Sequence, residues 1–447
     1  MRHWSFKPTA AQTPMRGDIR VPGDKSVSHR AVMLSSIANG SCVISGFLPG
    51  EDTVATATIF RQLGVRIETI QADALHVHGV GMNGLCGSER DLDCGNAGTA
   101  MRLLSGLLAG QAFNSTLTGD HSLRTRPMNR VLEPLRAMGA RIESQPGGRA
   151  PLHIQAMTQP LNGIRYQPSV ASAQVKSCVL LAGLYASGTT RIEESHPTRD
   201  YTERLLQAMH YPIAFGPGYA ELQGGYSLQA TDIRIAGDFS SAAFLIVAAS
   251  LIPGSELTIR RVGLSPTRIG LLHALSLMGA NISIRNMRDE ATERVGDITV
   301  RHAELEGVEI PREIVPDMID EFPILFVAAA MANGTTVVRG AEELRVKESD
   351  RIESMVNGLR AMGVEIESLP DGAIIHGTQQ FTTNADTDAN IVIESQGDHR
   401  IAMSFAVLAA AAQVPVAIHD VDNVRTSFPG FEDLMESLAI RLQSVTA

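Results

Sequence analysis

A helix, turn and strand that return at a nearly fixed interval are the feature that most constrains what this chain can fold into. In the clearest copy, LRAMGARI, an amphipathic helix ends at a glycine and a strand follows directly. The intervals between copies run from about 70 to 85 residues. A period this long argues against a thin solenoid and predicts tandem small α/β units. In the six copies the glycine position holds Gly64, Gly139, His210, Gly279, Gly363 and Ala439.

A second element recurs with the same period. It is a helix rich in Ala, Ser and Leu that leads through a Gly- or Pro-containing turn into a strand. Because these helices are apolar nearly all round, we expect them to be buried rather than to lie on a surface. The six copies cover residues 29–47, 99–119, 173–194, 240–262, 322–340 and 399–420.

Six α/β units therefore account for nearly all of the 447 residues, a length for which two or three domains are expected. The natural division is three units and three, with a boundary within residues 233–238. The N-terminal strand at 17–23 could cross back to the second half. We predict one discontinuous domain of residues 1–21 and 238–447, a second of residues 22–237, and a site in the cleft that they form.

The residues that precede the buried helices are polar: GDKSVSHR, DCGNAGTAMR, VASAQVK, GDFSS, IDEFP and GDHR. Helix N-termini carry unpaired N–H groups and a partial positive charge, so they attract anions. Short loops add cations at corresponding places of the repeat, although the whole chain has a net charge of −10. This local excess predicts a strongly anionic ligand. The loop cations are Arg124, Arg126, Arg199, Arg345, Lys347 and Arg351.

Composition and motifs exclude several other classes. The acidic balance gives no support for nucleic-acid binding. No apolar stretch is long enough to span a bilayer, no signal core is visible, and the four cysteines show no paired spacing, so we expect a cytoplasmic protein with reduced thiols. Because HExxH and GxxxxGK[ST] are absent, we expect no metal and no cofactor.

Three carboxylates lie among these cations: Asp320, Glu321 and Glu348. A carboxylate in an anion-binding site repels its ligand unless it transfers protons. The alternative is that the carboxylate forms a salt bridge to Lys347 or Arg351. For Glu321 the salt bridge and the proton-transfer role are equally well supported by the sequence.

Seven strings in collinear order resemble the enolpyruvyl transferase that makes 5-enolpyruvylshikimate 3-phosphate. They are VPGDKSVSHRA, GNAGTAMRLLSGLLAG, SAQVKSCVLLAGLYA, PTRDYTERLL, RVKESDRI, GDHRIAM and TSFPGF. The resemblance implies a two-domain inside-out α/β barrel with three βαβαββ units per domain and buried helices. It also implies transfer of the enolpyruvyl group of phosphoenolpyruvate to the 5-hydroxyl of shikimate 3-phosphate, in chorismate and aromatic amino-acid biosynthesis. We expect a monomer that acts on these two small molecules.

The resemblance also carries roles to individual residues. The catalytic set that it implies is Asp320, Glu348 and Lys25. The shikimate 3-phosphate set is Lys25, Ser26, Arg30, Ser172, Ala173, Gln174, Arg199, Asp320 and Lys347. The phosphoenolpyruvate set is Lys25, Gly98, Arg126, Gln174, Arg351 and Arg400. Each substrate carries a carboxylate and a phosphate, so the site has to neutralise about five to six negative charges.

Some positions resemble the second class of the family. Ala173 stands where some members have a second serine, and Arg425 stands one residue further from the final FP than the lysine of the other class. Glyphosate competes with phosphoenolpyruvate in this family, and tolerant members tend to carry Ala at the position of Gly98. We therefore predict sensitivity, although Leu103 stands where the sensitive class often has Pro.

Two alternatives belong to other functional classes. A UDP-N-acetylglucosamine enolpyruvyl transferase shares the fold but uses a cysteine in the region that corresponds to residues 123–127, where this chain has none. A repeat scaffold without activity would not need Lys25, Asp320 and Glu348 together.

Overall fold

The structure, a computed structural model, describes residues 2–8, 12–382 and 391–446. Contacts divide the chain into two compact units, of which the first consists of Met1–Pro22, Gly237–Asp289 and Arg294–Ala447. The second consists of Gly23–Ala236 with the short segment Glu290–Glu293. The boundaries predicted from the sequence lie one residue away from these, apart from that short segment.

The second unit contains three α/β repeats, each with a four-stranded sheet of the same strand order. In every sheet the first strand runs parallel to the second, and the other two form an antiparallel hairpin beside it. The first sheet is β16(Ile233–Arg234), β3(Asn39–Ser45), β5(Ala74–Val80), β4(Arg66–Gln71). The next is β6(Leu92–Asp93), β7(Ser115–Thr118), β9(Arg149–Ile154), β8(Ile142–Gln145). The third is β11(Arg165–Tyr166), β13(Thr189–Glu193), β15(Tyr219–Gln223), β14(Ile213–Gly216), and β10(Leu161–Asn162) pairs with β12(Ala186–Ser187).

The helices of this unit are of two kinds. Three are buried almost along their whole length and pack against one another: α1(Lys25–Ser36), α3(Gly98–Ala109) and α6(Ala173–Gly183). Three others lead into the hairpins, α2(Glu51–Gln62), α5(Asn129–Ala137) and α7(Tyr201–Ala208), and the short α4(His121–Thr125) precedes α5. The buried helices were predicted from their apolar composition, and the structure confirms that prediction.

The first unit repeats the plan, with strands borrowed from the N-terminus. One sheet is β2(Arg16–Ile19), β17(Glu256–Gly263), β19(Arg294–Arg301), β18(Asn281–Asp289), so the N-terminal strand does return to this half. The next is β20(Thr335–Val338), β22(Gly372–His376), β21(Glu365–Leu369). The last is β23(Ile391–Glu394), β24(Val416–His419), β1(Arg2–Phe6), β25(Leu442–Thr446).

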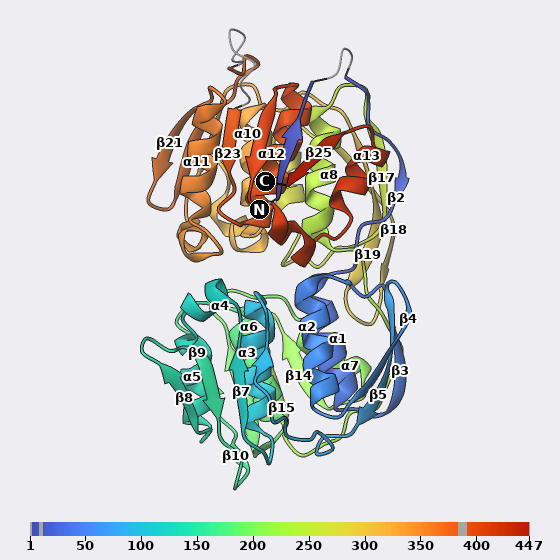
Figure 1. Cartoon of the computed structure of the whole chain (residues 1–447), viewed down its shortest axis with the longest axis vertical. Helices are drawn as coiled ribbons and strands as arrows, with labels where there is room; N and C mark the ends of the chain where they lie inside the picture. The colour runs from blue at the N-terminus through green and yellow to red at the C-terminus, as the bar shows by residue number, and fades with distance from the viewer. Residues whose placement is uncertain (1, 9–11, 383–390, 447) are drawn as a thin grey trace. The chain divides into compact units, whose positions relative to one another are not determined.

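Three buried helices again form the centre: α8(Phe239–Leu251), α10(Phe322–Ala330) and α12(His399–Ala412), of which α12 packs against both others (Figure 1). The remaining helices are α9(Gly270–Leu277), α11(Arg351–Ala361), α13(Phe431–Ser437) and the 3₁₀ turns η1(Arg312–Ile314), η2(Pro316–Met318), η3(Glu342–Val346) and η4(Asp422–Thr426). Among the described residues, none of the helices combines the length and the apolar character that crossing a membrane requires.

Candidate active site

The buried helices are accessible chiefly at their first turns. On α1 only Lys25 and Ser26 are not fully buried, and on α6 only Ala173 and Gln174. On α12 the partly exposed residues are Arg400, in the first turn, and Ala412 at the far end. An apolar helix gains by burying its whole surface, so polar residues that remain open at its N-terminus need another reason. Contact with a ligand supplies that reason.

Arg30 holds α1 to its neighbours in the second unit. Its guanidinium donates to Thr202 Oγ1 at 2.9 Å, to Ser177 Oγ at 2.8 Å and to the backbone oxygen of Ser26 at 2.9 Å. Burial lowers the pKa of Arg30 to about 10, although Glu203 and Asp24 act in the opposite direction. Arg30 therefore remains charged near neutrality, and the first turn of α1 is anchored in one geometry.

Lys25, one turn earlier, forms an ion pair with the buried carboxylate of Asp52 on α2. Its neighbour His29 is buried, and its Nδ1 lies 2.8 Å from Thr56 Oγ1. Burial, followed by the charges of Lys25 and Arg30, lowers the pKa of His29 well below its ordinary value. The imidazole therefore stays neutral and adds no positive charge beside Lys25.

The starts of α3 and α6 are linked by side chains. Gln174 Nε2 donates to Thr99 Oγ1 at 2.9 Å, and Arg102 Nη1 donates to Gln174 Oε1. Thr99 and Arg102 are the residues of α3 that are not fully buried. A methyl group added to Gly98 would lie 3.4 Å from Arg126 Nη1 and 3.7 Å from Arg102 Nη1. Gly98 thus leaves open a space beside two guanidinium groups.

Other predicted residues of the second unit frame this region. Arg126 donates to Asn96 Oδ1 at 2.7 Å and to Ser122 Oγ at 3.2 Å. Ser172 is the N-cap of α6, where its hydroxyl accepts from the Val175 N–H at 3.4 Å. Arg199 lies in the segment before α7 and is partly exposed. The structure brings Gly98, Arg126 and Gln174 together around Arg102, and places Lys25, Ser26 and Arg30 on α1.

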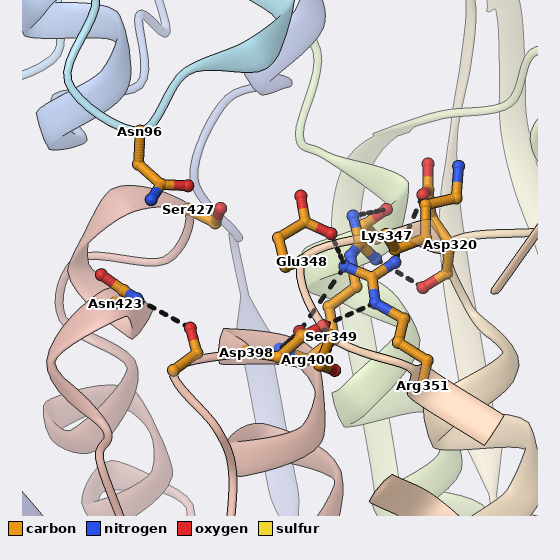
Figure 2. A network of polar contacts seen from close by, with 12 residues as sticks. Asn96, Asp320, Lys347, Glu348, Ser349, Arg351, Asp398, Arg400, Asn423 and Ser427 are labelled. Carbon is orange, nitrogen blue, oxygen red and sulfur yellow. Dashed lines mark hydrogen bonds and ion pairs between the residues drawn. The ribbon is translucent and has the colours of Figure 1, made fainter. Parts of the chain in front are cut away.

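Arg351, the first residue of α11, is the centre of the polar network in the first unit (Figure 2). Its side chain is only 2% exposed, and its Nε donates to Asp398 Oδ2 at 2.7 Å. Its Nη2 donates to Glu348 Oε2 at 2.5 Å, and its Nη1 lies 3.7 Å from Asp320 Oδ1. Burial alone would lower the pKa of Arg351, but Asp398, Glu348 and Asp320 raise it above its ordinary value. Both predicted proton-transfer carboxylates therefore lie beside one permanent cation.

Arg400, in the first turn of α12, joins the same network (Figure 2). Its Nη1 donates to the backbone oxygen of Asp320 at 2.7 Å, and its Nη2 to Ser240 Oγ at 3.2 Å. Glu321 is buried and accepts from Ser240 Oγ, and its Oε1 lies 3.5 Å from Arg400 Nη1. Glu321 is therefore a buried partner of a cation, but that cation is Arg400 and not Lys347 or Arg351, the partners considered from the sequence.

Two further predicted cations lie on 3₁₀ turns of the first unit. Lys347 follows η3, and its Nζ donates to Glu343 Oε1 at 3.2 Å. Arg425 lies on η4 and is exposed. The structure connects Asp320, Glu348, Arg351 and Arg400 directly, whereas Lys347 is bound to a different carboxylate.

Several members of these networks were missed in the sequence. Arg268, which is buried, donates to Asp238 Oδ1 at 2.8 Å and to Ser240 Oγ at 2.9 Å. A signal was present, because its string SPTRIG repeats the PTR of the Arg199 segment at the corresponding place of another unit. Asp398 was not singled out either, although it caps α12 through the Arg400 N–H at 2.9 Å. In GTAMR, Thr99 and Arg102 are spaced by three residues, so both lie on one face of the first helical turn.

These features define a class: a two-unit α/β protein whose buried helices present cations, with carboxylates beside them, at their first turns. The comparisons with known proteins are specific. The family model of EPSP synthase (3-phosphoshikimate 1-carboxyvinyltransferase) matches residues 9–435. This chain belongs to the EPSP synthase family.

Individual relatives match along practically the whole length. A 3-phosphoshikimate 1-carboxyvinyltransferase of Xanthomonas campestris pv. campestris (strain B100) is 57% identical over 443 residues, which cover 99% of this chain and 98% of that protein. The protein of the same name from Xanthomonas axonopodis pv. citri (strain 306) is 56% identical over 442 residues. An EPSP synthase structure from Acinetobacter baumannii superposes with a TM-score of 0.88, at 43% identity and with 100% of both chains covered. The family and the two-domain α/β fold expected from the motifs are confirmed, while the roles of single residues stay predictions.

Proposed function

We propose that this protein transfers the enolpyruvyl group of phosphoenolpyruvate to the 5-hydroxyl of shikimate 3-phosphate and releases inorganic phosphate. The observation that carries this proposal is the 57% identity, over 99% of the chain, to a 3-phosphoshikimate 1-carboxyvinyltransferase. The cations at the first turns of the buried helices support it, because both substrates carry a carboxylate and a phosphate.

We assign the two substrates to the residues that the family motifs indicate. Shikimate 3-phosphate is bound by the α1 and α6 starts, by Arg199, and by Asp320 and Lys347. Phosphoenolpyruvate is bound around Gly98 and Arg126, with Lys25, Gln174, Arg351 and Arg400. Because these residues come from both units, both units have to contribute to the complex with both substrates.

The reaction that we propose is an addition followed by an elimination. Asp320 takes the proton of the 5-hydroxyl, whose oxygen forms a bond to C2 of phosphoenolpyruvate while C3 receives a proton. The tetrahedral ketal then loses a proton from C3, the C–O bond to phosphate breaks, and the double bond re-forms. Glu348, assisted by Lys25, exchanges the C3 proton, and the guanidinium of Arg351, 2.5 Å from Glu348, stabilises the carboxylate between transfers.

A substitution of Glu348 tests this assignment. Glu348→Gln should lower turnover by about 10²- to 10⁴-fold, because positioned proton transfer contributes about that factor. It should leave the affinity for shikimate 3-phosphate nearly unchanged, and it should slow the exchange of deuterium from D₂O into C3. Glu353→Gln, at an exposed position of α11 five residues further along the chain, is the matched control. A loss of affinity with normal turnover would make Glu348 an orienting residue.

The product itself separates this reaction from its nearest alternative. Mass spectrometry after incubation with phosphoenolpyruvate and both acceptors should show the enolpyruvyl ether of shikimate 3-phosphate and no modified UDP-N-acetylglucosamine. The α4 region, which corresponds to the cysteine loop of the alternative enzyme, contains no cysteine. A monomeric state and a cytoplasmic location also remain proposals, to be tested by light scattering and by fractionation.

A further inference from the structure

Two histidines and a glutamate lie together on the outer face of the first sheet of the second unit. The strands β3, β4 and β5 run side by side there (Figure 1). His76 and His78 are two residues apart on β5, so both side chains point to one face, while Leu75 and Val77 point to the core. Glu68 on β4 is directly opposite His76. The three side chains are about one-third exposed.

The potential ligand atoms of this cluster face one another. Glu68 Oε2 lies 3.7 Å from His76 Nδ1 and 3.6 Å from His78 Nε2, and all three atoms lie within 4.8 Å of one another. These separations are too long for hydrogen bonds. Around a tetrahedral Zn²⁺ with bonds of 2.0–2.1 Å, ligand atoms are about 3.3 Å apart, so only small rotations of the side chains are needed.

In His78 and Glu68, neighbouring residues contact the side-chain atom that points away from the cluster. The atom that points into the cluster is left to bind a metal ion. Ser41 Oγ on β3 lies 3.0 Å from His78 Nδ1, which directs His78 Nε2 toward the glutamate. This Nε2 is buried and has no hydrogen-bond partner among the described residues. Arg66 binds only Oε1 of Glu68, at 2.8 Å from its Nε, so Oε2 is left for the histidines. Second-shell contacts of this kind orient metal ligands in proteins.

We propose that Glu68, His76 and His78 bind a divalent transition-metal ion of the zinc type. Imidazole and carboxylate suit Zn²⁺, and an exposed three-ligand site leaves water to complete the coordination. The site lies outside the residues assigned above to substrate binding and catalysis. The motif search of the sequence did not find it, because the third ligand comes from another strand.

The repeat provides matched controls inside the same chain. His153 pairs with Thr116 Oγ1 at 3.1 Å, and His376 pairs with Thr335 Oγ1 at 2.9 Å, at the places that correspond to His78 and Ser41. Two residues before these histidines stand Pro151 and Ile374, so a second imidazole is missing. The pairs of His153 and His376 therefore retain any structural role that a histidine–hydroxyl pair has, but a single imidazole cannot chelate a metal ion.

Calorimetric titration of the full-length, EDTA-treated protein with ZnCl₂, in the absence of substrates, tests the proposal. A Cys86→Ser background removes the exposed thiol. We expect one Zn²⁺ per chain. Zinc affinity should fall at least about tenfold in His76→Ala and in His78→Ala, and about tenfold in Ser41→Ala. His153→Ala should bind as the parent does, and Mg²⁺, which prefers oxygen ligands, should not bind at this site.

Thermal unfolding of each metal-free variant establishes that it is folded, and Glu68→Gln replaces any variant that is not. Zn²⁺ should raise the melting temperature of the parent and of His153→Ala, and should not raise that of the His76→Ala/His78→Ala variant. Three results would overturn the proposal: no zinc binding by the parent, an affinity within twofold of the parent in both histidine variants, or an equal loss in His153→Ala.

Discussion

Gly98 shows how one missing side chain can decide which ligand is accepted. A methyl group at this position would meet Arg126 Nη1 at 3.4 Å, an ordinary contact, so the fold should tolerate Ala. The methyl group would nevertheless occupy space beside the guanidinium groups that we assign to phosphoenolpyruvate. Glyphosate is longer than phosphoenolpyruvate, so it should lose more affinity.

We therefore predict that the parent protein is sensitive to glyphosate and that Gly98→Ala raises its inhibition constant more than the KM for phosphoenolpyruvate. Inhibition measured against varied phosphoenolpyruvate provides both numbers. Resistance of the parent together with tight phosphoenolpyruvate binding would contradict the prediction. It would indicate that the placement of α3 governs the discrimination, since Leu103 of this helix stands where the sensitive class often has Pro.

Single site residues could be predicted where they belong to a family string or to the repeat. They could not be predicted where the contact forms only between residues that are far apart in the sequence. The strings indicated Arg351 and Glu348, which are three residues apart. Asp398, the buried partner of Arg351, is 47 residues further along the chain, and no spacing in the sequence reveals such a contact. Arg268 could have been found by comparing repeats, since it occupies the place of Arg199.

At the level of elements, the residue that follows the helix before each hairpin has the same backbone conformation, with a positive φ, in all six repeats. The four glycines have φ between +85° and +97°, and the two exceptions, His210 and Ala439, have φ of +61° and +67°. A left-handed conformation costs a residue with a side chain about 1–2 kcal/mol, and glycine avoids this cost. The repeat pattern thus predicted a turn whose physical requirement is a positive φ.

Substitutions at these helix ends should change stability in opposite directions. Ala439→Gly should stabilise the protein by about 0.5–1 kcal/mol, and Gly139→Ala should destabilise it by about 1 kcal/mol. Space is not the cause at Gly139, because an added methyl group would lie 3.7 Å from Asn162 Nδ2. Urea unfolding checks both values. Equal stabilities of the two variants would show that strain at this turn is negligible.

The helices α6 and α7 are tied together by a buried charge. Lys176 Nζ lies 2.9 Å from both Glu194 Oε2 and Glu203 Oε1. Burial opposes the charge of Lys176, but Glu203 and Glu194 raise its pKa above the ordinary 10.5. Burial also raises the pKa of Glu203, although the ammonium group of Lys176 acts in the opposite direction.

Lys176→Met should therefore destabilise the protein by about 3–5 kcal/mol, because it leaves buried carboxylates without a partner. A raised lysine pKa contributes stability fully below pH 10.5, and this contribution is lost as the pH rises through the folded-state pKa. The difference between variant and parent should accordingly shrink in alkaline solution. Arg165→Met, which removes an exposed ion pair with Glu193, should change stability by less than about 1 kcal/mol. Equal effects at both positions would refute this account.

At the scale of the whole molecule, the six-unit count and the 3 + 3 division followed from periodicity, but the completion of the last sheet did not. β1(Arg2–Phe6) is inserted between β24 and β25, more than 400 residues away in the sequence. A five-residue strand carries too little pattern to specify its partners. Pairing of such strands is decided by the edges that the other repeats leave open.

A change in the shape of the whole molecule is expected when both substrates bind. Since residues of both units are assigned to one complex, we predict that shikimate 3-phosphate and a phosphoenolpyruvate analogue together reduce the radius of gyration. Small-angle scattering of the free protein, of the binary complex and of the ternary complex measures it. An identical radius in all three states would contradict closure.

The measurement that tests the central claim most directly is phosphate release from phosphoenolpyruvate by the purified protein. We predict release only when shikimate 3-phosphate is present, one phosphate per enolpyruvyl ether formed, and none with UDP-N-acetylglucosamine. Lys25→Met should abolish this release and weaken both ligands, because Lys25 is assigned to both substrates. Equal release with UDP-N-acetylglucosamine, or release without any acceptor, would contradict the proposed function.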